Sequence, residues 1–195
     1  MVAPLEAPLD GVIPVAAHRR LLDYTVGPND IALPFTQRLA QENAWSLAYA
    51  ARVIEEYKRF SYLCIHSKRA CTPSLDVDQA WHLHLTYSRD YWGEFCPNLL
   101  GKSLHHGPTE GGAKEDVKFL DQYNETLQYY EQVFQVPPPS DVWPKANIRF
   151  SQHLRLRWVD LSKVYAVQRK KVHKVLPILL LGMALLTVAI ITLLF

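Results

Sequence analysis

Residues 175–195 contain no charged side chain, and this segment constrains the chain more than any other part of it. About twenty apolar residues, at roughly 1.5 Å of rise each, are enough to cross about 30 Å of hydrocarbon as a helix. A helix that packs on a soluble core would be apolar on one face only. The sequence therefore predicts one C-terminal transmembrane helix at residues 175–195.

The residues that border this span predict its orientation. A basic cluster lies on its N-terminal side only, and consists of Arg169, Lys170, Lys171, His173 and Lys174. Such clusters stay on the cytoplasmic side of a membrane. The first residues of the chain lack the basic start and apolar stretch of a secretory signal. We therefore expect a tail-anchored, single-pass membrane protein with its N-terminal domain in the cytoplasm.

Charge and cysteine content limit the partners and the compartment. The formal net charge is +2, and much of the positive charge lies in residues 145–174, a basic juxtamembrane segment suited to anionic lipid headgroups. No zinc-finger spacing or RNA-binding signature is present, so no nucleic-acid partner is expected. The odd count of three cysteines fits a reducing compartment. Cys64 is expected to be a small buried side chain, and Cys71 a thiol in a loop.

Apolar periodicity predicts a mainly α domain. Residues 36–64 carry a 3.6-residue apolar stripe, with Thr36 as a plausible N-cap. A second helix is predicted over residues 74–95, bracketed by Pro73 and Pro97, and a third over residues 114–135, with Val117 facing inward.

The remaining segments complete the predicted organisation. The glycine-containing stretch 97–112 is expected to be a loop that contacts with other groups hold in place. Residues 154–158 fit either a short strand or a helical stalk into the anchor. The predicted division is an N-terminal extension (1–28), a helical domain (29–144), the basic juxtamembrane segment (145–174) and the anchor (175–195).

Metal-ligand side chains crowd into the second predicted helix and the loop after it. The candidates are Asp78, His82, His84, Cys96, His105 and His106. Histidine and cysteine are the usual ligands of zinc and other transition metals, so this density suggests a metal site. The spacing matches none of the standard zinc signatures.

Helix geometry limits which candidates can meet. On a helix, His82 and His84 are about 200° apart and face opposite sides, so they cannot share an ion. His84 would face the core, where a hydrogen-bonded structural role is the alternative to metal binding. Asp78 lies one turn before His82 and would orient its ring. Cys96 lies roughly 20 Å further along a straight helix.

Two alternatives stay open at this point. His105 and His106 lie in a loop that can fold back to either face of the helix. Both could instead cap the ends of helices or loops. If residues 81–87 formed a strand, His82 and His84 would lie on one face and chelate together.

Several motifs resemble a known family. They are Arg38 to Ser46 (RLAQENAWS), Glu56 to Phe60 (EYKRF), Val77-Asp78 with Trp81-His82-Leu83-His84 (WHxH), then Tyr91, Cys96 and His105-His106. This pattern resembles the glycine-rich domain-containing protein-like family of bacteria and plants, over about residues 29–144. The resemblance implies a mainly helical domain and supplies no reaction. The chain has eight glycines and no glycine-rich tail, so roles tied to the extra domains of plant members do not carry over.

These observations predict a cytosol-facing, membrane-anchored helical domain that binds a transition metal. Zinc is the expected ion, held by His82 and by His105 or His106, with His84, Asp78 and Cys96 as further candidates. Whether the domain catalyses a reaction is left open. The alternative is a membrane adaptor or accessory subunit of a larger membrane complex, in which the histidine-rich core is purely structural.

Overall fold

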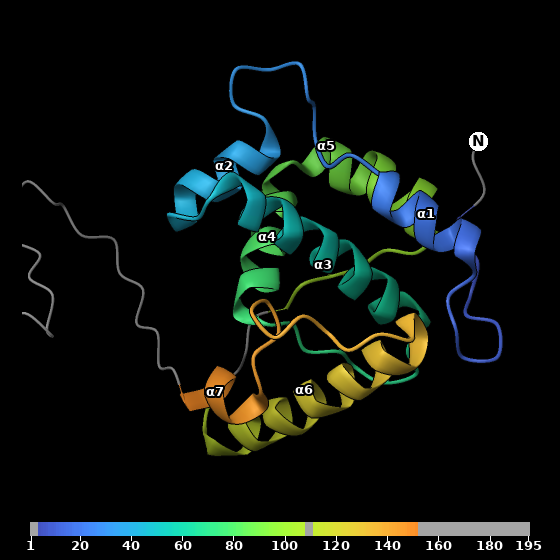
Figure 1. Ribbon diagram of the computed structural model, residues 1–195, viewed down its shortest axis with the longest axis vertical. Coiled ribbons are helices and arrows are strands. Elements are labelled where there is room, and N and C mark those ends of the chain that lie inside the picture. The colour runs from blue at the N-terminus through green and yellow to red at the C-terminus, as the bar shows by residue number, and fades with distance from the viewer. Residues whose placement is uncertain (1–3, 108–110, 152–195) are drawn as a thin grey trace, which may run out of the picture. The chain divides into compact units, whose positions relative to one another are not determined.

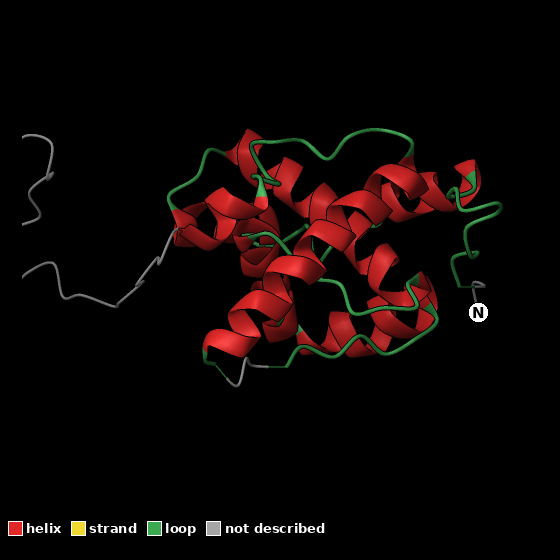
Figure 2. Ribbon diagram, turned by 90° about the horizontal axis from the view of Figure 1, so that it is seen from below, coloured by secondary structure: helices red, strands yellow, loops and turns green. Residues whose placement is uncertain are grey.

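A computed structural model describes residues 4–107 and 111–151, and the regular secondary structure in these ranges is helical (Figure 1). In chain order the elements are α1 (Val15–Asp23), α2 (Phe35–Asn43), α3 (Leu47–His66), α4 (Leu75–Thr86), α5 (Ser88–Asp90), the π-helix η1 (Tyr91–Leu100), α6 (Ala113–Phe134) and α7 (Ala146–Ser151). Within the described ranges β pairing is limited to one isolated bridge between Leu9 and Val12, and Figure 2 accordingly shows helices and loops without strands. The predicted mainly α class is confirmed.

Two predicted elements lie outside the described residues. They are the strand or stalk at residues 154–158 and the transmembrane helix at residues 175–195. Among the helices that the structure does describe, none has both the length and the apolar character needed to cross a membrane.

The single helix predicted over residues 36–64 is wrong, because the chain forms two helices there. Ala44 adopts a left-handed conformation (φ 55°) directly after α2 and ends it. The hydroxyl of Ser46 then accepts the backbone N–H of Tyr49 at 3.1 Å and caps the start of α3. The predicted N-cap Thr36 lies inside α2, which begins after Pro34.

Helix α3 is the central element and contacts α1, α2, α4, η1 and α6 (Figure 1). Two charged side chains of α3, Glu56 and Lys58, are buried. Lys58 donates to the carbonyls of Leu22 and Tyr24 at the end of α1, the latter at 2.9 Å. Burial lowers the pKa of Lys58 to about 8. These bonds join α1 to the core, although residues 1–28 are predicted as an N-terminal extension of the helical domain.

The second predicted helix begins as expected and ends later than expected. Ser74 caps α4 by accepting the N–H of Val77 at 3.2 Å. The helix bends at Tyr87 (φ −86°, ψ 53°), and η1 continues through Pro97 to Leu100. The predicted end at residue 95, before Pro97, is wrong, because η1 includes Pro97. In a π-helix the N–H of residue i+5 bonds to the carbonyl of residue i, so the proline removes one bond, to the carbonyl of Trp92, and the helix continues on both sides of it.

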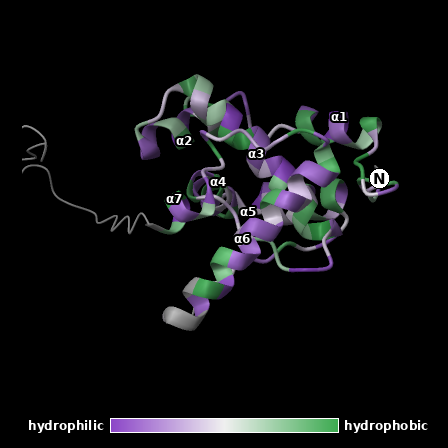
Figure 3. Ribbon diagram, turned by 60° about the horizontal axis from the view of Figure 1, so that its bottom comes forward, coloured by the Kyte–Doolittle hydropathy of each residue, from purple (hydrophilic) through white to green (hydrophobic). Residues whose placement is uncertain are grey.

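Helix α6 matches the third predicted helix to within one residue at each end. Figure 3 shows hydrophilic and hydrophobic residues alternating along it. Tyr130 and Phe134 are buried, whereas Val117, predicted to face inward, is 63% exposed. The apolar face therefore joins the core only in the later turns, where α6 packs against α3.

Candidate metal centre

Helix α4 supplies two of the candidate ligands from neighbouring turns. Asp78 and His82 are four residues apart on the same face, as predicted, with His82 Nδ1 3.7 Å from Asp78 Oδ2. That separation is too long for a hydrogen bond. Because residues 75–86 are helical, the alternative strand at residues 81–87 is wrong, and His84 points to the opposite side, into the core.

The third member of the cluster, His106, comes from the loop between η1 and α6. Its Nε2 lies 2.9 Å from Asp78 Oδ1, within hydrogen-bonding distance. Its ring also lies against Trp81 and His82, with centroid separations of 4.4 and 4.3 Å. Of the two loop histidines, the structure thus brings His106 to the face of α4 that carries His82.

A buried hydroxyl holds this loop in place. Tyr91 accepts a hydrogen bond from Trp81 Nε1 at 2.9 Å and donates one to the carbonyl of Leu104, two residues before His106. Tyr91 is fully buried, and its burial raises the pKa of the phenol well above the ordinary value. The hydroxyl therefore stays protonated and keeps donating to the loop.

The cluster has the dimensions of a metal site. Asp78, His82 and His106 each offer one ligand atom, and these atoms all lie within 4.8 Å of one another. Tetrahedral bonds of about 2.0–2.2 Å to nitrogen and oxygen place neighbouring ligand atoms roughly 3.3 Å apart. The 2.9 and 3.7 Å separations, which involve different oxygens of Asp78, bracket that value, so small side-chain rotations would suffice to hold an ion.

Solvent reaches His82, and a cation interacts with Asp78. The side chain of His82 is 51% exposed, against 21% for Asp78 and 18% for His106. The guanidinium of Arg149, from α7, interacts electrostatically with Asp78 and Asp76. Burial lowers the pKa of Arg149 while these carboxylates oppose the shift, and its Nε has no hydrogen-bond partner among the described residues.

His84 belongs to a separate buried network. Its Nε2 lies 2.6 Å from Asp90 Oδ2, and its Nδ1 lies 2.8 Å from the hydroxyl of Tyr57. Asp90 also accepts the hydroxyl of Tyr24 at 2.7 Å and the N–H of Gly27 at 3.2 Å. Both nitrogens of His84 thus have protein partners, and the side chain is 0% exposed.

The pKa shifts in this network assign the protons. Burial lowers the pKa of His84 and outweighs the charge of Asp90. For Asp90, burial acts to raise the pKa, but the hydrogen bonds from His84, Tyr24 and Gly27 lower it overall. Neutral His84 therefore donates from Nε2 to an ionised Asp90 and accepts from Tyr57 at Nδ1.

The other two candidates lie in different surroundings. His105 is exposed, and its ring lies 5.1 Å from that of Trp92. Cys96 is buried in η1, where its thiol interacts with Tyr91 and with the backbone of Leu104. Among the described residues, the group able to hold a metal is therefore Asp78, His82 and His106.

The supporting residues are harder to find in the sequence than the ligands. Tyr91 belongs to the motifs that resemble the family, but nothing in the sequence shows that it holds the loop of His106, and Arg149 carries no local motif.

The geometry defines a helical domain with an open His₂Asp cluster, and comparison with known proteins assigns its family. The UCP032817-like family matches residues 30–129, and the chain belongs to this family. Glycine-rich domain-containing protein 1 of Arabidopsis thaliana is 27% identical over 106 residues, and Glycine-rich domain-containing protein 2 is 23% identical over 106. Each match covers 52% of this chain and 13% of the relative. No solved structure matches.

The matched region contains the whole cluster, because residues 30–129 include Asp78, His82 and His106. The resemblance to the glycine-rich domain-containing proteins is confirmed. The chain spans a small part of the length of the two plant relatives, so the resemblance applies to the shared helical region alone.

Proposed function

We propose that this domain binds one transition-metal ion, zinc being the expected ion, through Asp78, His82 and His106. The observation that carries the proposal is the convergence of three ligand atoms within 4.8 Å of one another from two separate segments of the chain. Asp78 and His82 are fixed by α4, and His106 is fixed by a loop that Tyr91 anchors.

The ligand set and its exposure favour an open site. Zinc sites with three protein ligands keep a fourth position for water or substrate, whereas structural zinc sites use four protein ligands. Two histidines and one carboxylate also suit non-haem iron(II). A metal bound here would act as a Lewis acid and activate a bound water molecule. The exposed side of His82 leaves room for that ligand.

Metal analysis of the purified full-length chain tests the proposal. We expect about one equivalent of zinc per chain. His82→Ala and His106→Ala should each lose it, because either change leaves two ligands. The matched control is His105→Ala, which removes the adjacent histidine of the same loop and should keep the metal. Wild-type protein that binds no metal in the presence of micromolar zinc and iron(II) would contradict the proposal.

The same chain has a second candidate role as a membrane adaptor with a structural histidine cluster. The direct 2.9 Å contact between His106 and Asp78 favours it, because this bond satisfies both groups without a metal. In that case His106→Ala should destabilise the fold of a protein that carries no metal. The metal analysis above therefore separates the two roles.

We also propose that residues 175–195 anchor the protein in a membrane with the helical domain on the cytoplasmic side. Support comes from the charge-free span and from the basic residues that precede it. Protease should digest the domain in inverted vesicles and spare it in right-side-out vesicles. Removing residues 175–195 should release the protein from membranes, because the basic segment alone contributes only about 1 kcal/mol per charge and is screened by salt.

A further inference from the structure

A pair of cysteines lies at the C-terminal end of α3 and is independent of the metal centre. Cys64 lies in the last turn of α3, and Cys71 lies in the loop that leads to α4. The two thiols lie close enough that each one shifts the pKa of the other. Both are partly exposed, whereas the third cysteine, Cys96, is buried elsewhere. Proximity of two thiols is the first requirement for a disulfide.

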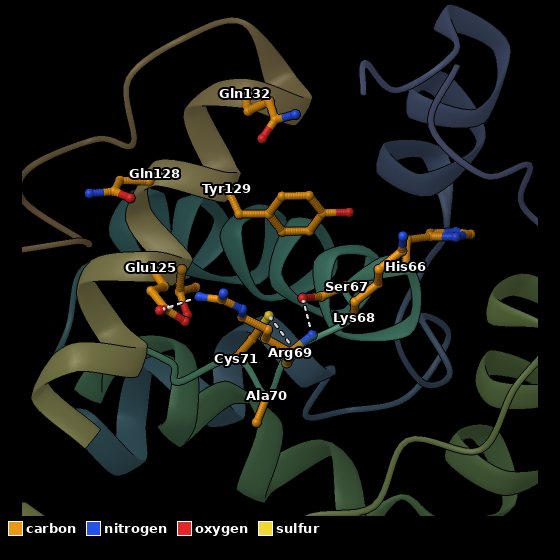
Figure 4. A pocket seen from close by; sticks show the side chains of 11 residues that line it. His66, Ser67, Lys68, Arg69, Ala70, Cys71, Glu125, Gln128, Tyr129 and Gln132 are labelled. Atoms are coloured by element: carbon orange, nitrogen blue, oxygen red, sulfur yellow. Dashed lines mark hydrogen bonds and ion pairs between the residues drawn. The ribbon is translucent and has the colours of Figure 1, made fainter. Parts of the chain in front are cut away.

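Cys71 lines a cavity of about 380 Å³ between this loop and α6 (Figure 4). The end of α3 and the loop contribute residues 66–71, and α6 contributes Glu125, Thr126, Gln128, Tyr129 and Gln132. An ion pair between Arg69 and Glu125 links the two walls. A water molecule occupies about 30 Å³ of liquid volume, so the cavity admits a small oxidant to the Cys71 thiol.

The surroundings of the two sulfur atoms differ. Hydrogen bonds from Cys64, Ser67 and Thr126 lower the pKa of Cys71, although burial acts in the opposite direction. Burial raises the pKa of Cys64 well above its ordinary value. Cys71 is therefore the thiol that ionises first, and Cys64 remains protonated beside it. A nucleophilic thiolate next to a second thiol is the arrangement of redox-sensing cysteines.

We propose that Cys71 is a peroxide-reactive thiol and that Cys64 resolves its oxidised form as an intramolecular disulfide. The Cys71 thiolate attacks one oxygen of hydrogen peroxide, the O–O bond breaks, and the other oxygen leaves as hydroxide and takes a proton to become water. The sulfenic acid on Cys71 is then attacked by the sulfur of Cys64. The S–S bond forms, the S–O bond breaks, and the second oxygen leaves as water with the Cys64 proton. Two thiols lose two electrons to one peroxide.

The loop position of Cys71 lets the second step proceed. The sulfur atoms must approach to about 2.05 Å, and Cys71 lies in a loop, which adjusts more readily than a helix. A thiol pair of this kind fits a reducing compartment, where disulfides are mostly transient and regulatory.

Oxidation of the full-length protein tests this inference. The purified protein is treated with a few equivalents of hydrogen peroxide, its remaining thiols are alkylated, and non-reduced peptides are analysed by mass spectrometry. We expect a peptide pair joined through Cys64 and Cys71 and an unmodified, alkylated Cys96. Before oxidation, Cys71 should alkylate at least about tenfold faster than Cys96, because thiolate character and access set the rate.

Single variants separate the two steps. In Cys64→Ser the sulfenic acid on Cys71 should persist and be trapped by dimedone, whereas Cys71→Ser should leave Cys64 reduced. Cys96→Ser is the matched control and should form the disulfide at the wild-type rate. Oxidation of Cys96 before Cys71, or a disulfide that joins two chains through Cys71, would overturn the inference. Neither result would affect the metal proposal, since the two clusters share no residue.

Discussion

Two histidines of one helix, two residues apart, lie in opposite environments. His82 and its partners Asp78 and His106 lie at the surface, where the side chain of His82 is half exposed. His84 is fully enclosed, with Asp90 on one ring nitrogen and Tyr57 on the other. Both sites pair histidine with aspartate. They differ in whether the ring nitrogens of the histidine on α4 already have partners: those of His84 do, and those of His82 have none from Asp78.

That difference decides what each site can do. Nδ1 of His84 accepts from Tyr57 and Nε2 donates to Asp90, so the ring has no free atom to offer a metal. His82 makes no hydrogen bond within 3.5 Å to Asp78 and keeps its nitrogens available. Residue type alone therefore does not define a metal site. A histidine becomes a candidate ligand when the fold leaves its nitrogen unsatisfied beside other ligands.

The largest expected effect is on stability, and it separates the two histidines. His84→Ala should lower the free energy of unfolding by about 3 kcal/mol or more, because it leaves the buried hydroxyl of Tyr57 and the carboxylate of Asp90 without a partner. His82→Ala should change it by no more than about 0.5 kcal/mol, since the side chain is half exposed. Chemical denaturation of the metal-free protein measures both. Equal losses would break the distinction between the sites.

Much of this contrast could be predicted from sequence, because it follows from helical periodicity. The 3.6-residue repeat places Asp78 with His82 and turns His84 inward, and the structure has both features. The choice of His106 over His105 could not be predicted. It depends on the bond from Tyr91 to Leu104, which joins a loop and a helix without a local sequence signal.

The partners of His84 escaped prediction for a similar reason. Asp90 lies beyond the bend at Tyr87, so no helical spacing relates it to His84. Tyr57 comes from α3, a different helix. Apolar periodicity also could not predict that residues 36–64 form two helices, since the break at Ala44 contains neither glycine nor proline.

A second prediction compares the two aspartates. Asp78→Asn should weaken metal binding by about 10- to 100-fold, because a neutral amide holds a cation less well and orients the histidines less firmly. It should leave the helical fold intact. The matched variant Asp90→Asn should leave metal affinity unchanged and destabilise the fold. Competition with a zinc-sensitive dye and unfolding measurements report the two quantities. Loss of metal binding in Asp90→Asn but not in Asp78→Asn would show that the metal binds in the core, at Asp90.

The third prediction concerns pH. The folded-state pKa of His84 is lowered by burial from its ordinary value of 6.5, so the unfolded state binds more protons just below pH 6.5. Stability should therefore fall as the pH drops through that window, by up to about 1.4 kcal/mol per pH unit for one group. The pKa of Asp90 is lowered too, so its contribution is present above about pH 3.8 and is lost only at lower pH.

His18 and His66 complicate this measurement, because burial lowers their pKa values as well. A variant with His18→Gln and His66→Gln isolates the contribution of His84. Denaturation of this variant in its metal-free form at pH 7 and pH 5 should still show the fall in stability. A flat profile would show that His84 is as easily protonated in the folded as in the unfolded state, against the enclosed network described above.

The smallest effects test how completely the network around His84 is closed. Tyr24→Phe removes a hydrogen bond to Asp90, whose side chain is 20% exposed, so water can replace the lost hydroxyl. Tyr57→Phe removes the partner of His84 Nδ1, which no water can reach in a side chain with 0% exposure. We expect a cost of about 1 kcal/mol for Tyr24→Phe and about twice that for Tyr57→Phe. Equal costs would mean that solvent enters at the Tyr57 end. His84 would then resemble His82, and the contrast between the two sites would be one of degree.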